Sequence, residues 1–169
     1  MERSMTIGEA VVSFWKKGFK FSGRSRRREY WLSGLGHLII FLLLALFAIL
    51  LELITGGSMK IMKIYGFLTG EVFYWISFIP GMALGYRRLQ DININGIYSI
   101  IFTVIFIPFL IMEYFIPDEK LFSFDNTLTT IHTVGMLLAV VAGLVFFILA
   151  CITGTRGPNK YGADPKYKG

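Results

Sequence analysis

Residues 24–51 read RSRRREYWLSGLGHLIIFLLLALFAILL, and this stretch decides the fold. Four arginines stand before Trp31, and no charged side chain follows until Glu52. A helix over Trp31–Leu51 has 21 uncharged residues, enough to cross about 30 Å of hydrocarbon. Lys and Arg gather on the cytoplasmic side of membrane spans. The stretch therefore predicts a transmembrane helix whose first residues lie in the cytoplasm.

The composition favours a membrane protein. The 169-residue chain is 54% hydrophobic and 17% charged, with a mean hydropathy of +0.61, whereas soluble domains carry about 25% charge. The alternative is a soluble all-α domain with unusually apolar helices, which the length of the uncharged stretches disfavours. The net charge of +6 would suit nucleic acid, but an excess of Lys and Arg on the cytoplasmic side explains it more simply, so we expect no nucleic-acid partner.

Few residues suit a metal, a cofactor or catalysis. Cys151 is the single cysteine and stands in an apolar run, where it is predicted to be a small hydrophobe. No Cys/His cluster has metal-site spacing, and no phosphate-loop, dinucleotide, zinc-hydrolase or serine-nucleophile motif occurs. We therefore expect no cofactor and no enzymatic activity. The first apolar run is also longer than the ~7–15 residues of a signal-peptide core, so no cleavable signal is expected.

Four apolar segments predict an all-α fold, a polytopic membrane protein with one membrane domain over residues 1–169. The second segment is the least clear, because only Val72–Tyr86 is uncharged and its extension back to Tyr65 includes Glu71. Pro108 is expected to kink the third segment. The predicted parts are an amphipathic helix at 6–20, transmembrane helices at 31–52, 65–86, 97–116 and 133–153, and a cytoplasmic tail at 154–169.

The distribution of basic residues predicts the topology. Fourteen of the 17 Lys and Arg residues lie in the N-terminal tail, in the gap after the second segment or in the C-terminal tail. The other gaps hold only Lys60, Lys63 and Lys120, with several acids. This split fits four spans with both termini in the cytoplasm, and it argues that the second segment crosses the membrane.

Before the first span, the pattern predicts a short amphipathic helix. Ile7, Val11, Phe14, Trp15 and Gly18 fall on one helical face, and polar residues take the other. Thr6 and Glu9 have capping-box spacing. One interpretation places this helix at the inner membrane interface, with its aromatic residues in lipid. The other packs its apolar face on the protein's own cytoplasmic loops.

Small and polar residues within the segments suggest how the helices pack. Two four-residue spacings of glycine occur in the second segment, Gly66/Gly70 and Gly81/Gly85. Such spacings allow close helix contact in lipid, either within one four-helix unit, which we favour, or between two copies. His37 and Glu71 lie at membrane depth, where ionisable groups are functional candidates, but two positions do not form an ion path and we favour structural roles.

Three stretches are predicted to meet at the cytoplasmic face, and they carry a family resemblance. They read FSGRSRRREYW at 21–31, GYRRLQDI at 85–92 and GPNKYGADP at 157–165. Their order around four apolar segments resembles the domain-of-unknown-function 805 family of small bacterial inner-membrane proteins. The middle stretch departs from the family pattern, which has a His before the Asp and then a Gly-Arg-Ser-Gly-Trp-like run, where this chain has Gln90 and residues 92–97. The resemblance implies a location in the bacterial inner membrane and no established activity.

The converging residues define a candidate site for lipid or a protein partner. Arginines outnumber the acids Glu29, Asp91 and Asp164, so some would lock the loops by ion pairing and others would hold anionic lipid phosphates. A homo-oligomer or another membrane protein is a further partner hypothesis. The leading alternative is a small oligomeric transporter or channel, and a lipid-acting enzyme would need Glu29 or Asp91 unpaired. The candidate residues are Arg24, Arg26, Arg28, Glu29, Tyr30, Trp31, Arg87, Arg88, Asp91, Arg156, Asn159, Tyr161 and Asp164.

Overall fold

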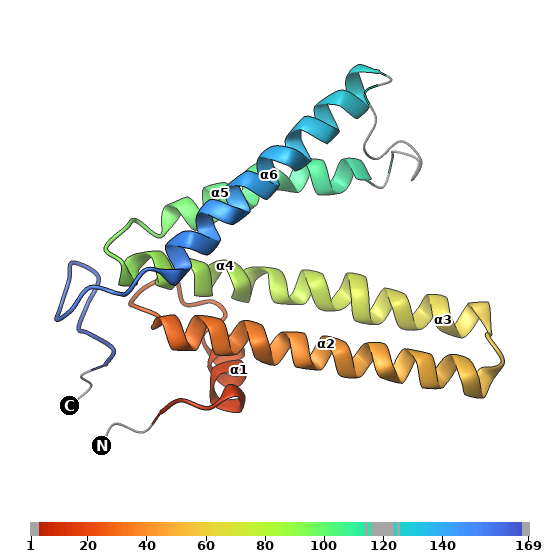
Figure 1. Cartoon of the computed structure of the whole chain (residues 1–169), viewed down its shortest axis with the longest axis horizontal. Coiled ribbons are helices and arrows are strands. Elements are labelled where there is room, and N and C mark those ends of the chain that lie inside the picture. Colours follow the sequence, from red (N-terminus) through yellow and green to blue (C-terminus); the bar gives the residue numbers. More distant parts are fainter. Residues whose placement is uncertain (1–3, 114, 116–123, 125, 167–169) are drawn as a thin grey trace.

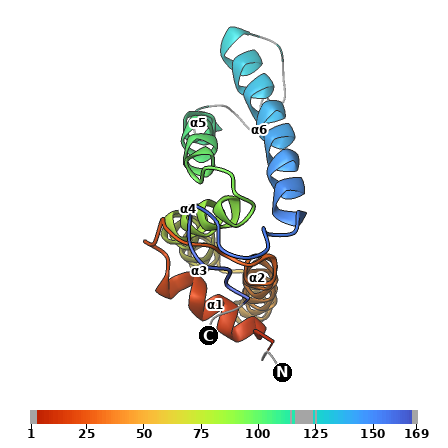
Figure 2. The same cartoon turned by 90° about the vertical axis from the view of Figure 1, so that its left-hand side faces the viewer.

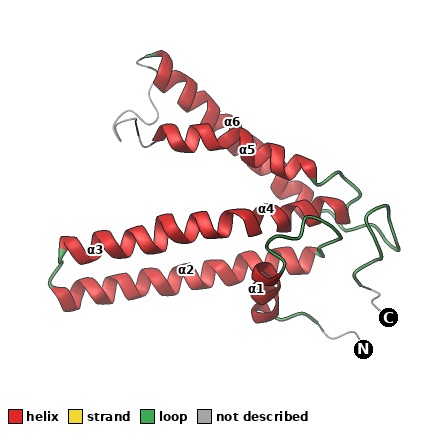
Figure 3. Ribbon diagram, turned by 180° about the vertical axis from the view of Figure 1, so that it is seen from behind, coloured by secondary structure: helices red, strands yellow, loops and turns green. Residues whose placement is uncertain are grey.

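The structure is a computed structural model that describes residues 4–113, 115, 124 and 126–166. Within these residues every regular element is helical. The elements are α1 (Ile7–Lys16), α2 (Arg27–Thr55), α3 (Met59–Gly66), η1 (Phe67–Val72), α4 (Phe73–Asp91), α5 (Ile97–Glu113) and α6 (Thr127–Cys151). Figures 1 and 3 show two long helical hairpins that meet at one end and diverge toward the other.

The first hairpin pairs α2 with a helix that runs without a break from Met59 to Asp91. Its turn is made by Gly56 and Gly57, whose positive φ angles of 62° and 75° favour glycine. The second arm changes from α-helix to a wider π-helical turn at η1, where Glu71 lies, and returns to α-helix in α4. The helix therefore extends beyond both ends of the predicted span at 65–86.

The second hairpin consists of α5 and α6, and α6 begins with a capping box formed by Asn126 and Thr129. In the described part of the chain, three helices are long and apolar enough to cross a membrane: Arg27–Thr55, Met59–Asp91 and Thr127–Cys151. The apolar part of α5, Ile97–Phe109, is shorter. The third predicted span reached residue 116, and both 114 and 116 lie outside the described residues.

The buried side chains are unusually polar. Among the described residues, thirteen buried side chains are polar or charged and six are hydrophobic. The polar ones lie where the hairpins meet, apart from Thr129, His132 and Thr133 near the start of α6. Large apolar side chains such as Leu43, Phe47 and Leu138 are exposed instead along both hairpins. This distribution is the reverse of a soluble domain and suits a chain whose long helices face lipid.

Helix α1 packs across the first hairpin, close to the start of α2 (Figures 1 and 2). Its capping box forms as the sequence predicts, with Thr6 accepting from the backbone of Glu9. Ala10 and Phe14 are buried, and Gly36 of α2 leaves room for Val11, since a Cβ there would overlap the Val11 side chain. The expectation that Phe14 enters lipid is therefore wrong, because this side chain is covered by protein. It packs against the long helix α2, where its ring centroid lies 4.3 Å from that of His37, and not against loops.

A further packing expectation needs correction. A Cβ added to Gly66, Gly70 or Gly81 would meet no described atom within 4 Å, so these glycines do not mediate packing within one four-helix unit. Only Gly85 of the two pairs is closely approached, by Ser99 and Phe146. Nδ1 of His37 lies 2.7 Å from the carbonyl oxygen of Ser33 on its own helix.

Candidate functional site

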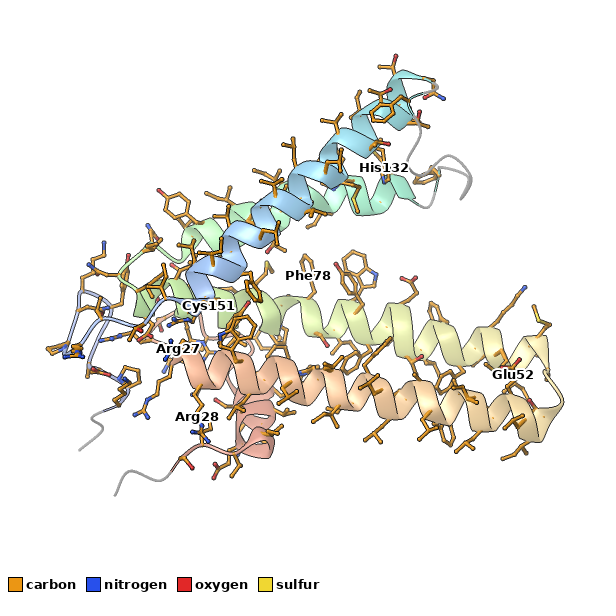
Figure 4. The ribbon with its side chains drawn as sticks, viewed as in Figure 1. Arg27, Arg28, Glu52, Phe78, His132 and Cys151 are labelled. Carbon is orange, nitrogen blue, oxygen red and sulfur yellow. The ribbon has the colours of Figure 1, made fainter. Side chains whose placement is uncertain are left out.

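The site lies where the two hairpins meet, and we call it the polar cap. It comprises residues 24–29, 87–91 and 151–166, together with Ser13 and Lys17 of α1. Figure 4 shows polar side chains gathered there, near Arg27, Arg28 and Cys151. Three sequence-distant segments supply it: the loop leading into α2, the last turn of α4 and the tail after α6. The cap therefore joins both hairpins.

Asp91, the last residue of α4, bridges two arginines from different segments. Its Oδ1 accepts from Nε of Arg24 at 3.0 Å, and its Oδ2 accepts from Nη1 of Arg88 at 2.6 Å. All three side chains are at most 5% exposed. Charge-assisted hydrogen bonds of this kind are stronger than neutral ones and fix the orientation of both partners. Asp91 therefore locks the loop before α2 onto the end of α4.

The same two arginines hold the chain that leaves α6. Arg88 donates to the carbonyl oxygens of Ala150, at 3.2 Å from Nε, and of Ile152. Arg24 donates to the carbonyl oxygens of Gly157, at 2.6 Å from Nη1, and of Thr155. The last carbonyls of a helix have no partner within the helix and attract cations. The Arg88 guanidinium therefore caps the C-terminus of α6, and the Arg24 guanidinium holds the tail that follows it.

Backbone contacts complete the attachment of the tail to α4. The amide of Thr155 donates to the carbonyl oxygen of Asp91 at 2.9 Å, and Nδ2 of Asn159 donates to that of Gln90 at 3.0 Å. Gly154 lies against the carboxylate of Asp91, and a Cβ at this position would overlap it. Glycine at 154 is therefore required for the tail to approach the bridging carboxylate.

A second ion-paired centre attaches α1. Glu29 accepts from Oγ of Ser13 at 2.7 Å and from Nζ of Lys17 at 3.1 Å, and its Oε1 lies 3.5 Å from Nη1 of Arg87. Glu29 and Arg87 are buried, whereas the Lys17 side chain is 40% exposed. Nη2 of Arg87 is buried without a hydrogen-bond partner among the described residues. Glu29 thus links α1, α2 and α4.

The tail folds into a compact turn around Asp164. The carboxylate accepts from the backbone amides of Gly157 at 3.0 Å and of Lys166 at 2.9 Å. The hydrogen bond from Lys166 contributes most to lowering the pKa of Asp164 below its ordinary value, while burial opposes this shift. Asn159 and Gly162 pair through two backbone hydrogen bonds of 3.0 Å. Asp164 therefore acts as an ionised organiser of the tail.

Other arginines of the cap lie nearer its surface and surround a hollow of about 180 Å³. Arg27, Arg28 and Arg156 are exposed, and Arg26 is partly exposed. Arg27 donates to the carbonyl oxygen of Cys151 at 3.3 Å, and Arg28 donates to that of Met5 at 3.0 Å. The basic residues lining the hollow are Arg24, Arg26, Arg27, Arg28, Arg156 and Lys166.

The structure brings most of the predicted site residues into the cap, in separate groups. Arg24, Arg88, Asp91 and Asn159 belong to the α6 attachment, and Asp164 organises the tail beside it. Glu29 and Arg87 form the second centre. Tyr161 lies on the tail, where its amide donates to Oδ1 of Asn159 at 2.9 Å. Arg26, Arg28 and Arg156 line the hollow. Tyr30 and Trp31 contact aromatic residues of α6, with ring centroids 6.4 Å from that of Phe146 and 5.0 Å from that of Phe147, respectively.

Sequence reasoning missed Ser13, Lys17, Gln90 and Thr155. Ser13 and Lys17 lie four residues apart on the polar face of the predicted helix, which is a signal for a shared partner on another element. Gln90 contributes its backbone carbonyl, and Thr155 contributes its backbone amide and carbonyl together with its hydroxyl group, which donates to the carbonyl oxygen of Asp91 at 3.1 Å. Sequence carries no signal for the backbone contacts. Among the described residues no group of His, Cys, Asp and Glu has the geometry to hold a metal ion.

Comparison with known proteins agrees with a membrane location. The chain is 29% identical to the inner membrane protein YhaI of Escherichia coli strain K12 over 156 residues, which covers 92% of this chain and 94% of YhaI. It is 27% identical to the inner membrane protein YhaH of the same organism over 147 residues, covering 86% and 87%. No solved structure matches. The family model described as "Protein of unknown function (DUF805)" matches residues 18–163, and the chain therefore belongs to the DUF805 family.

Proposed function

We propose that this protein is a non-enzymatic protein of the bacterial inner membrane whose polar cap faces the cytoplasm and binds the phosphate groups of anionic lipids. In this proposal four helices span the membrane, both termini are cytoplasmic, and α1 lies near the inner interface. Fourteen of the 17 basic residues then lie on the cytoplasmic side. Anionic lipids of the cytoplasmic leaflet attract basic segments at this level.

The observation that carries the proposal is the division of the arginines into two groups. Arg24, Arg87 and Arg88 are buried and ion-paired with Asp91 or Glu29, so they hold the cap together. The exposed arginines donate to backbone carbonyls or face solvent around the 180 Å³ hollow. Each basic group near an anionic membrane surface contributes roughly 1 kcal/mol to lipid binding. The second group therefore supplies the lipid-binding charge.

The ion pairs also bear on the alternatives. A lipid-acting enzyme was expected to hold Glu29 or Asp91 unpaired, and both carboxylates are ion-paired. A transporter was expected to use His37 or Glu71. His37 instead packs against aromatic rings, 4.3 Å from that of Phe14 and 6.2 Å from that of Phe73. Lipid binding by the cap thus requires the fewest additional assumptions.

The test measures thermal stability of the full chain in detergent with added cardiolipin, phosphatidylglycerol or phosphatidylcholine. We expect the two anionic lipids to raise the melting temperature and phosphatidylcholine to leave it unchanged. Arg156→Ala and Arg27→Gln should reduce this shift without lowering the melting temperature in detergent alone. Lys63→Ala, at an exposed basic residue of α3 remote from the cap, is the matched control. Equal shifts with anionic and zwitterionic lipid in the wild type would refute lipid binding by the cap.

A separate experiment tests the topology. Reporter fusions after Gly57 and Asn126 should report the periplasm, and fusions after Gln90 and Gly169 should report the cytoplasm. A cytoplasmic signal at Asn126 would contradict the four-span arrangement, since α5 would then fail to cross.

A further inference from the structure

An apolar groove of about 500 Å³ lies between the two hairpins, next to the polar cap. All four long helices line it, and its walls include the rings of Tyr30 and Trp31 of α2, Phe78 of α4 and Phe146 of α6. Figure 4 shows Phe78 in the angle between α4 and α6, on the side that opens toward the diverging arms. Ligand sites are typically clefts of about 300–1,000 Å³ with mainly apolar walls. The groove has the size and lining of a site for a hydrocarbon ligand.

The groove also holds a few polar groups. Oγ of Ser77 is buried without a hydrogen-bond partner among the described residues, and Ser77 lines the groove. The Ser99 hydroxyl donates to the carbonyl oxygen of Met82, and the Thr103 hydroxyl donates to the carbonyl oxygen of Ser99, so both donors are already used within the protein. A few hydroxyl groups in an aromatic cleft suit the ester region or a kinked chain of a lipid better than an ion, which would need several polar ligands close together.

Arg27 connects this groove to the cap. It precedes Tyr30 and Trp31 by three and four residues, so the three side chains share one face of α2. Its guanidinium lines the basic hollow and donates at 3.3 Å to the carbonyl oxygen of Cys151, one turn beyond Phe147 of the groove wall. Figure 4 shows Arg27 and Cys151 together at the closed end of the angle. This contact is to a neutral acceptor, and a phosphate would be a stronger one.

We propose that the groove holds an acyl chain of a single anionic phospholipid whose phosphate lies at Arg27, on the rim of the basic hollow. This inference rests on the proposed function and adds where the hydrocarbon part of the ligand is bound. The basic rim at Arg27 and the aromatic cleft at Tyr30 lie one helical turn apart on α2, and they match the charged and apolar ends of such a lipid. A second copy of the chain fits less well, because one turn of a helix 10 Å wide already fills roughly 420 Å³ of the groove.

The test uses phosphatidylglycerol with a diazirine near the end of one acyl chain, added to the full-length protein in nanodiscs. After illumination, mass spectrometry should find labels on groove residues of α4 and α6, around 77–82 and 143–147. Gly143→Phe fills the groove, since the glycine lines it and a Cβ there meets no described atom within 4 Å. It should reduce this labelling at least about tenfold. Gly66→Phe is the matched control, because Gly66 has the same open space but lies outside the groove.

Each result has a defined meaning. Labels spread over the outer faces of the helices, with the melting-temperature shift by phosphatidylglycerol intact, would overturn the groove and leave headgroup binding by the cap in place. A doubled mass with cross-links between two chains through the groove would assign it to a second copy and also overturn the proposal. If Arg27→Gln leaves the labelling of the groove unchanged, the proposed contact between the phosphate and Arg27 is overturned. Loss of the lipid preference in the melting assay would instead refute the proposed function itself.

Discussion

Replacing Asp91 with Asn should destabilise the protein by about 3–5 kcal/mol, the cost of removing one partner from a buried ion pair. Each carboxylate oxygen of Asp91 accepts from a different arginine, Arg24 at 3.0 Å and Arg88 at 2.6 Å. An amide has only one acceptor oxygen, so one guanidinium would face an N–H donor. Both arginines keep their backbone carbonyl partners, which keeps the cost near that of one broken pair instead of two.

The assay is unfolding of the full-length protein in detergent micelles, followed by circular dichroism as a denaturant is added. A second readout is the rate of trypsin cleavage after Arg156, which should rise because Asp91 no longer fixes the orientation of Arg24, whose guanidinium holds the tail. Glu52→Gln, at an exposed acid far from the cap, is the control and should change the stability by less than about 0.5 kcal/mol. A loss below about 1 kcal/mol for Asp91→Asn would refute the role given to the bridge.

A double-mutant cycle separates the bridge from a general loss of packing. Arg24→Met should itself be destabilising, because it removes the pair with Asp91 and the bonds to the tail. The double variant Arg24→Met/Asp91→Asn should lose less stability than the sum of the losses of the two single variants, with a coupling free energy of about 1–3 kcal/mol. Additive effects would show that the two residues do not act as one unit.

Three further predictions concern the rest of the cap. Gly154→Ala should release the tail, seen as faster trypsin cleavage after Arg156, because the new methyl group overlaps the carboxylate of Asp91; wild-type cleavage would contradict this contact. Glu29→Gln should destabilise the protein by about 3 kcal/mol in the same denaturant assay, since it leaves a buried arginine without its counter-charge, and an unchanged midpoint would count against the second centre. The lowered pKa of Asp164 means that its carboxylate stabilises the docked tail above its ordinary value of 3.8, and this contribution is lost as the pH falls through the lowered pKa. Hydrogen exchange of the tail amides, corrected for pH, should therefore stay slow down to pH 3.8 and lose protection below it, and Asp164→Asn should remove this dependence.

The long helices could be predicted because their signal is local. The uncharged run of Trp31–Leu51 predicts α2, and the spacing of Thr6 and Glu9 predicts the start of α1. Arg88 and Asp91 are three residues apart on one helix, so their ion pair could also be predicted from the sequence. These features depend on the spacing of residues within one segment, and this spacing can be read from the sequence alone.

The arrangement of the hairpins could not be predicted, and the reason is physical. In a membrane, the helix faces that meet lipid and those that meet another helix are both apolar, so hydropathy does not distinguish them. Gly81 and Gly85 look equivalent in sequence, yet only Gly85 is closely approached by another helix. The docking of α1 depends likewise on pairs of surfaces, such as Val11 against Gly36, which no single-segment pattern reveals.

The polar cap explains how the hairpins stay joined while their arms diverge. Lipid is as apolar as a leucine side chain, so the hydrophobic effect gives little reason for two helices to associate within the membrane. The contacts that do join the hairpins are concentrated at one end, where Arg24 and Arg88 bind α4 and the chain after α6 together. Beyond that end each hairpin exposes apolar side chains along its length. A joint at one end leaves the groove open to lipid from the side, and a ligand bridging the cap and the groove would then add contacts to both hairpins.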